Sequence, residues 1–157
     1  NILRSLRRII RAVDIHSRKI NTDFSVTVPQ LLCLYSLARN PEQTMVELAE
    51  DVNLGASTIN GIADRLEAKE LIHRRRSEKD RRKVFLDLTE KGQQLVTDAP
   101  PMLQETLSAR LNGLPELELA AISLALDKIV KLMEAEHIDA SPNLIPGGPL
   151  NKETGGP

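Results

Sequence analysis

Residues 44–88 determine the fold, and they read TMVELAEDVNLGASTINGIADRLEAKELI (44–72) followed by HRRRSEKDRRKVFLDL (73–88). Thr44 followed by Glu47 is a capping-box pattern, which predicts a short helix that begins after Thr44. The sequence Asn53-Leu54-Gly55 is a turn signal, and apolar residues then recur at positions 59, 62, 63 and 66, at helical spacing. The stretch therefore predicts a helix, a tight turn and a second helix from Ala56 to Lys69.

The second of these helices has an apolar face and a face suited to hydrogen bonding. The outward side chains are mostly small or polar, and they are Ser57, Thr58, Asn60, Gly61, Asp64 and Arg65. A recognition helix presents such side chains to the base edges in the major groove of duplex DNA. We therefore predict that Ser57, Thr58, Asn60 and Arg65 read bases. The alternative is a packed helix without a role in nucleic-acid binding.

A strongly basic hairpin is predicted next, with strands at residues 71–75 and 84–88 and with Val84, Leu86 and Leu88 alternating inward. Residues 73–83 contain seven basic and two acidic side chains. The basic ones are Arg74, Arg75, Arg76, Lys79, Arg81, Arg82 and Lys83. Cations this dense repel one another, which favours contact with an anionic partner such as DNA phosphate over a merely solubilising turn.

Composition limits the other classes of function. The chain has 157 residues and a net charge of −1, so its bulk charge indicates no partner, whereas residues 90–139 carry nine acidic and four basic side chains. The three aromatic residues are too few for stacking on single strands, which favours a duplex. The single cysteine, Cys33, excludes an internal disulfide and fits a reducing compartment. No apolar run approaches the roughly 20 residues that span a bilayer, so we expect a cytoplasmic protein without a membrane partner.

Helices are predicted on both sides of the central stretch. Residues 2–22 combine an apolar stripe with a basic face, and residues 27–40 begin with a capping box, Thr27 to Gln30, and are apolar nearly all round. Thr89 caps a further helix that Pro100-Pro101 interrupts, and Pro115 opens a last, strongly apolar helix. The first and last helices carry more apolar surface than a small monomer can bury, which predicts a homodimer.

The predicted fold class is therefore mostly α with a small β-hairpin wing, a winged helix-turn-helix that dimerises through its N- and C-terminal helices. We assign residues 27–89 to the DNA-binding domain and residues 1–26 and 90–137 to a helical dimerisation region. Residues 138–157 are rich in proline and glycine and are expected to form an irregular tail.

No catalytic or metal-binding motif is found. His16, His73 and His137 lie far apart in the sequence, without the paired spacing of metal ligands, and structural roles are expected for them. Cys33 lies in an apolar segment with no basic neighbour, which favours core packing over redox sensing. We therefore expect no enzymatic activity, no cofactor and no metal.

Several motifs resemble the MarR family of winged-helix regulators. They include Asp64-Arg65-Leu66-Glu67-Ala68-Lys69, the wing element Asp80-Arg81-Arg82 and the following Leu88-Thr89-Glu90-Lys91-Gly92. The resemblance covers about residues 1–137 and implies a homodimer that binds pseudo-palindromic duplex DNA, usually as a ligand-responsive repressor. It also implies that Arg82 reaches the minor groove and that Asp80 braces the wing. Gly55 and Glu70 depart from the family pattern, which usually has Ser and Gly there.

The first helix and the start of the tail are also similar to MarR-type regulators of compatible-solute genes, which would imply an osmotic signal. A small-molecule effector bound between the dimer helices and the helix-turn-helix is the alternative signal. The competing function is a winged-helix module that binds an acidic protein without sequence-specific DNA binding.

Overall fold

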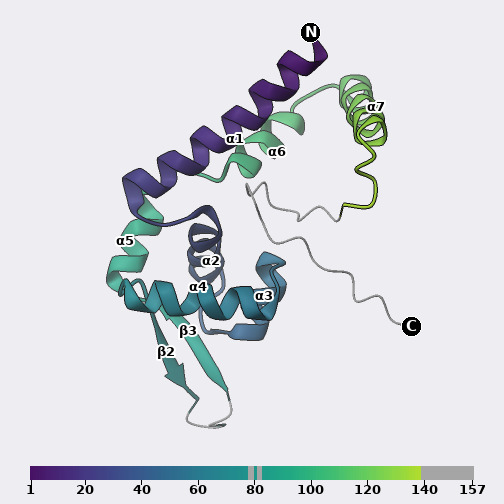
Figure 1. The fold of residues 1–157 in the computed structure, drawn as a ribbon. Helices are drawn as coiled ribbons and strands as arrows, with labels where there is room; N and C mark the ends of the chain where they lie inside the picture. The colour runs from purple at the N-terminus through teal and green to yellow at the C-terminus, as the bar shows by residue number, and fades with distance from the viewer. Residues whose placement is uncertain (78–79, 81–82, 139–157) are drawn as a thin grey trace, which may run out of the picture. The chain divides into compact units, whose positions relative to one another are not determined.

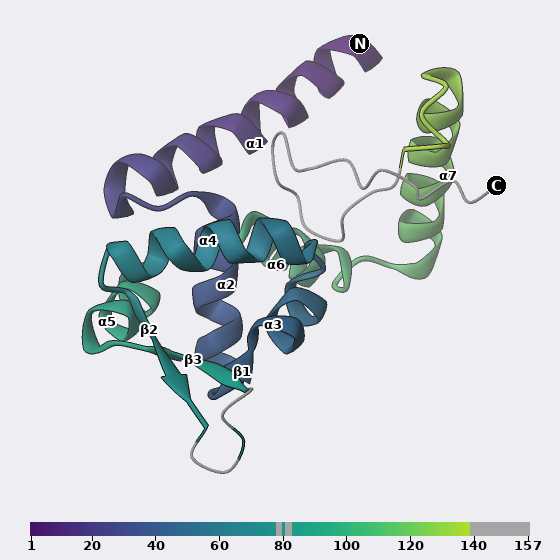
Figure 2. The same cartoon turned by 60° about the horizontal axis from the view of Figure 1, so that its bottom comes forward.

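The computed structural model describes residues 1–77, 80 and 83–138, and it divides the chain into two compact units. The first unit comprises residues 1–100 and the second begins at residue 101. In the first unit the elements, labelled in Figure 1 except for β1, which is labelled in Figure 2, are α1 (Ile2–Phe24), α2 (Val28–Arg39), β1 (Gln43–Thr44), α3 (Met45–Val52), α4 (Ala56–Ala68), β2 (Ile72–Arg76), β3 (Val84–Leu88) and α5 (Glu90–Asp98). The second unit contains α6 (Leu103–Leu111) and α7 (Glu116–Leu132).

Helix α2 is the centre of the first unit, as its apolar composition predicts. The capping box forms, with the Thr27 amide donating to Gln30 Oε1 (3.1 Å) and the Gln30 amide donating to Thr27 Oγ1 (3.4 Å). Leu31, Cys33 and Leu34 are fully buried. At its far end the Tyr35 hydroxyl donates to the carbonyl oxygen of Pro100 (2.7 Å), which ties the segment after α5 to the core.

Helices α3 and α4 form the predicted helix-turn-helix. The Thr44 amide donates to Glu47 Oε2 (2.7 Å) and the Glu47 amide donates to Thr44 Oγ1 (3.3 Å), so the second predicted capping box also forms. Asn53 ends α3 in the left-handed conformation (φ 50°), which an asparagine tolerates better than most residues. The Leu54 amide then donates to Ala49 O (3.0 Å), and the Leu54 side chain is buried. Figure 2 shows α4 lying across α2, with the hairpin projecting beyond both helices.

The sheet has three antiparallel strands in the order β1-β3-β2. The pattern predicted β2 and β3 within one residue of their observed bounds, but it did not predict β1. In β1, Gln43 pairs with Leu86 and Thr44 with Phe85, so the chain entering α3 is fastened to the hairpin. The predicted fold class, mostly α with a small β-hairpin wing, is confirmed.

The second unit and α1 carry most of the large apolar side chains that are exposed among the described residues. No residue of α6 or α7 is buried, and α7 exposes Leu117, Leu124 and Leu132 by 82%, 71% and 73%. In α1, which continues two residues beyond the predicted end, Ile2, Leu3, Ile9, Ile10 and Ile15 are exposed. The predicted interruption at Pro100-Pro101 separates α5 from α6. The division into domains stays a prediction, and the tail from residue 139 onward lies outside the described residues.

Candidate nucleic-acid interface

Helix α4 separates its apolar and polar side chains as the sequence predicts. Ile59, Ile62, Ala63 and Leu66 are buried, each 5% exposed or less. On the opposite side Ser57, Asn60 and Arg65 are exposed, and Thr58 and Gly61 are half-buried. An extra Cβ at Gly61 would have no atom within 4 Å, so the surface above this residue is open. The four residues predicted to read bases are therefore at least partly accessible to a partner, and their role in reading bases stays a prediction.

The register of the hairpin sorts its side chains onto two faces. Ile72 pairs with Leu88, Arg74 with Leu86 and Arg76 with Val84, and side chains of directly opposed residues share a face of a sheet. Leu86 is fully buried, so this inner face points toward the helices. The other face carries the pairs His73–Asp87 and Arg75–Phe85. Alternate arginines of β2 therefore have different surroundings.

Arg74 joins the hairpin to α4. Its Nη2 lies 2.6 Å from Asp64 Oδ1 and its Nη1 lies 2.7 Å from Glu67 Oε2, so one guanidinium bonds two carboxylates of the helix. The Arg74 side chain is 31% exposed. The hydrogen bond to Asp64, followed by smaller contributions that include the nearby charges of Glu67 and Asp64, raises the pKa of Arg74, which stays charged at every working pH.

Arg75 is held on the outer face of the hairpin. Its Nε donates to Asp87 Oδ2 (3.2 Å), and its Nη2 pairs with Glu42, which precedes β1. Its guanidinium also lies 5.5 Å from the centre of the Phe85 ring, within the range of a cation–π contact. Arg75 therefore connects β2, β3 and the entry to β1. Arg74 and Arg75, two of the cations predicted to contact DNA, are thus paired with carboxylates of the protein itself.

Two further cations, Arg76 at the end of β2 and Lys83 just before β3, lie nearer the tip of the wing. Arg76 and Lys83 are exposed. The turn closes through backbone bonds from the Ser77 amide to Lys83 O (3.0 Å) and from the Lys83 amide to Asp80 O (2.9 Å). The Asp80 amide donates to Ser77 Oγ (3.1 Å). The predictions for Lys79, Arg81 and Arg82 fall on residues outside the described part of the chain.

A buried polar cluster that the sequence pattern did not predict supports the helix-turn-helix. Ser36 of α2 is fully buried, and its hydroxyl lies 2.9 Å from Gln43 Oε1 of β1 and in hydrogen-bond contact with Asp51 of α3. Arg39 Nη2 is 3.7 Å from the same Asp51 carboxylate. This cluster fixes α3 and β1 against α2. A buried serine has no periodic signal, so only the structure identifies its role.

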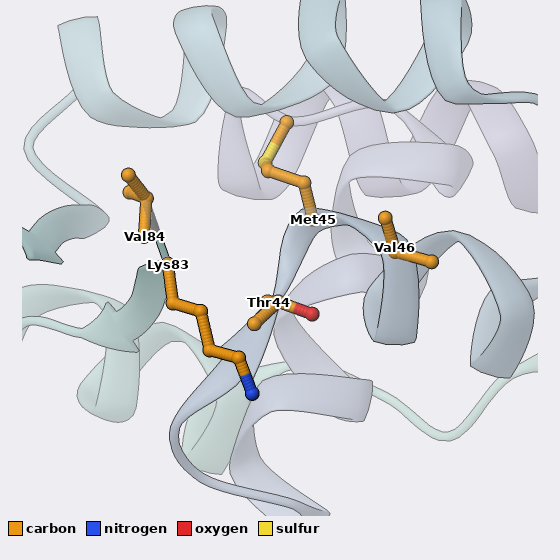
Figure 3. A pocket seen from close by; sticks show the side chains of 5 residues that line it. All are labelled: Thr44, Met45, Val46, Lys83 and Val84. Carbon is orange, nitrogen blue, oxygen red and sulfur yellow. The ribbon is translucent and has the colours of Figure 1, made fainter. Parts of the chain in front are cut away.

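A shallow hollow lies between the first turn of α3 and the start of β3, with a volume of about 430 Å³ (Figure 3). Thr44, Met45, Val46, Lys83 and Val84 line it. Most of its surface is apolar, with the Lys83 ammonium as its charged group. The hollow therefore adjoins the predicted DNA-contacting surface.

Cys33 and His16 both have shifted pKa values. Cys33 is fully buried, and burial raises the pKa of its thiol to about 12, so the reactive thiolate is scarce. Burial and the nearby Lys19 lower the pKa of His16. Within the described residues no cluster of His, Cys, Asp and Glu could hold a metal ion. Across that same part of the chain, no helix has both the length and the apolar character needed to cross a membrane.

A helix-turn-helix followed by a basic hairpin, with α4 presenting polar side chains, defines a winged helix-turn-helix. The MarR family model matches residues 26–84, from the start of α2 into the wing. This part of the chain is therefore similar to the MarR family, which agrees with the resemblance that the motifs carry.

Individual relatives align over most of the chain. The chain is 28% identical to the HTH-type transcriptional regulator YsmB of Bacillus subtilis over 129 residues, which cover 82% of this chain and 88% of YsmB. It is 28% identical to the HTH-type transcriptional regulator MgrA of Staphylococcus aureus, covering 74% and 71% of the two chains. Among solved structures it is similar to BpsR of Bordetella bronchiseptica, with a TM-score of 0.59, 28% identity and coverage of 82% and 92%. The DNA binding of BpsR is regulated by 6-hydroxynicotinic acid.

Proposed function

We propose that this protein is a MarR-type transcriptional regulator that binds specific sequences of duplex DNA. The observation that carries the proposal is the exposed polar face of α4 beside a basic hairpin. Ser57, Thr58, Asn60 and Arg65 read bases in the major groove. Arg76 and Lys83 contact phosphates, together with Lys79 and Arg81. The family resemblance assigns Arg82 to the minor groove and Asp80 to bracing the wing.

A second copy of the chain completes the site. The apolar residues that α1 and α7 expose are more than isolated surface side chains, and burying them in a homodimer removes them from water. Two copies of α4 then meet two half-sites about one helical turn apart on pseudo-palindromic DNA. The helical segments 1–26 and 90–137 form the dimerisation region in this proposal, and residues 27–89 form the DNA-binding domain.

The finer regulatory role is also a proposal. Most regulators of this type repress transcription, so we assign repression here. By analogy with BpsR, a small-molecule effector regulates DNA binding, and the hollow beside α3 is one candidate place for it. The narrower resemblance to compatible-solute regulators instead suggests an osmotic signal. An effector acts only if its affinity differs between the DNA-competent and DNA-incompetent dimers.

Selection of genomic DNA tests the proposed function. The full chain is incubated with fragmented genomic DNA, and the retained duplexes are sequenced. The proposal predicts a shared motif with two inverted half-sites, and the variant Ser57→Ala/Asn60→Ala should lose the preference while retaining weak binding. Arg82→Ala should weaken binding to the selected site by about 1–3 kcal/mol. Retention of fragments without a shared motif would favour the competing function, a module that binds an acidic protein.

A further inference from the structure

Two acidic residues lie on the helix that is proposed to enter the DNA groove. Asp64 lies four residues after Asn60 and seven after Ser57, so it shares their face of α4. Its side chain is 66% exposed, and that of Glu67, one turn further along, is 41% exposed. Carboxylates placed at a duplex repel its phosphates, so their presence on this face requires compensation.

Arg74 supplies that compensation from the hairpin. Its position opposite the buried Leu86 directs its side chain to the inner face, where it reaches both carboxylates at 2.6 and 2.7 Å. The planar guanidinium can bond two separate carboxylates with two different nitrogens, which the single ammonium of a lysine does less well. In the described part of the chain neither Asp64 nor Glu67 has another ion pair.

We propose that Arg74 is a positioning residue that neutralises Asp64 and Glu67, so that their charge does not repel the DNA, and that it does not itself bind a phosphate. This inference rests on the proposed function, because it concerns how α4 meets DNA. It changes the role predicted from the sequence, in which Arg74 was one of the wing cations that contact DNA. DNA binding then depends on Arg74 only as long as Asp64 and Glu67 are charged.

Charge-neutral substitutions distinguish shielding from phosphate contact. Arg74→Ala should weaken binding to the selected duplex roughly 10- to 100-fold, because two carboxylates are left uncompensated beside the phosphates. The triple variant Arg74→Ala/Asp64→Asn/Glu67→Gln should recover most of that loss. The slope of log affinity against log salt should stay unchanged in Arg74→Ala, whereas a lost phosphate contact lowers its magnitude by about 0.9.

Arg75→Ala is the matched control, because Arg75 pairs with Asp87 and Glu42 and not with α4. When Asp64→Asn and Glu67→Gln are added to Arg75→Ala, they should not recover the DNA affinity that Arg75→Ala loses. The Asp64→Asn/Glu67→Gln double variant changes only exposed side chains and keeps Arg74, so it should fold even if Arg74→Ala does not. It should bind the duplex at least as tightly as the parent protein.

The outcomes distinguish a failure of this inference from a failure of the proposed DNA-binding function. If the parent binds a selected duplex but the triple variant stays as weak as Arg74→Ala, with a reduced salt slope, Arg74 contacts phosphate and the inference is wrong. Weaker binding by the Asp64→Asn/Glu67→Gln variant would overturn it as well. If the parent binds no duplex at all, the proposed function fails, and the inference fails with it.

Discussion

A Cβ atom added at Gly92 would lie 2.0 Å from the carbonyl oxygen of Leu71. The same carbonyl accepts the Thr89 amide (3.1 Å), and Thr89 Oγ1 in turn accepts the Gly92 amide (3.0 Å). The first turn of α5 therefore packs directly against the backbone that enters β2. This contact gives a physical reason for the spacing Leu88-Thr89-Glu90-Lys91-Gly92, because the residue three positions after the capping threonine has no room for a side chain.

Gly92→Ala should therefore destabilise the protein. A methyl group at this position forces α5 away from Leu71, and overpacking of this kind costs about 1–3 kcal/mol of the free energy of unfolding. Urea denaturation followed by circular dichroism measures the change. Gly61→Ala is the matched control, since its added Cβ meets no atom and it should gain up to about 1 kcal/mol of helix stability. Equal free energies of unfolding for Gly92→Ala and Gly61→Ala would contradict the close contact between Gly92 and the Leu71 carbonyl oxygen.

The same Gly61→Ala variant should bind DNA less well although it is more stable. Gly61 lies on the exposed face of α4 between Asn60 and Asp64, where the helix is proposed to approach the base edges. A methyl group there holds the helix away from the groove, and we expect affinity for the selected duplex to fall roughly tenfold or more, the size of a lost base contact. Unchanged affinity in an anisotropy titration would show that the duplex does not approach this part of α4.

Glu70→Gly should stabilise the protein by about 1 kcal/mol. Glu70 has φ 59°, in the left-handed region, which costs a residue with a Cβ atom roughly 1–2 kcal/mol. Glycine avoids this cost in the folded protein, but it also makes the unfolded chain more flexible, which offsets part of the gain. Glu70 is exposed, and its ion pair with Lys91, at 3.9 Å, is weak. Glu50→Gly, the same substitution inside α3, should instead cost about 1 kcal/mol. Thermal unfolding should therefore show a higher melting temperature for Glu70→Gly and a lower one for Glu50→Gly. A lower melting temperature for Glu70→Gly would contradict the backbone strain at position 70.

The Cys33 thiol should be unreactive in the folded protein. Burial raises its pKa to about 12, so almost no thiolate exists at pH 8. A thiol-specific reagent should label the native chain only slowly, and it should label the chain fully in denaturant. Rapid stoichiometric labelling of the native protein, or loss of DNA binding after mild peroxide treatment, would indicate a redox role instead.

The raised pKa of Cys33 also has a consequence for stability. The unfolded thiol ionises near pH 8.5, while the folded thiol keeps its proton until about pH 12. Unfolding therefore releases a proton between these values, and the contribution of this group to stability falls as pH rises through that window. Cys33→Ala should show a shallower decline in the free energy of unfolding between pH 8.5 and 10.

The helix boundaries could be predicted because their signals are local. Thr27, Thr44 and Thr89 each lie at a helix start and accept the backbone amide three residues later, a pattern visible in the sequence. The buried face of α4 was likewise predicted correctly, because it depends on a repeat within 8 residues of one helix.

The ion pairs of the wing could not be predicted because they depend on contacts distant in sequence. Arg74 and Arg75 are neighbours in a basic run, yet the pairing of β2 with β3 sends one toward α4 and the other toward Glu42. Strand β1 contains only Gln43 and Thr44, which is too short for any alternating pattern. Each of these features follows from the register of the sheet, and a charge count cannot supply that register.

The central claim is that α4 and the wing bind a specific duplex. A fluorescence anisotropy titration of the full chain against a genomically selected duplex and a shuffled duplex of the same composition, repeated over a salt series, tests it most directly. The prediction is binding to the selected duplex at least about 10³-fold tighter than to the shuffled one. Its affinity should fall steeply with salt, by a slope of about −0.9 for each phosphate contact. Equal affinity for both duplexes together with a flat salt response would contradict the claim.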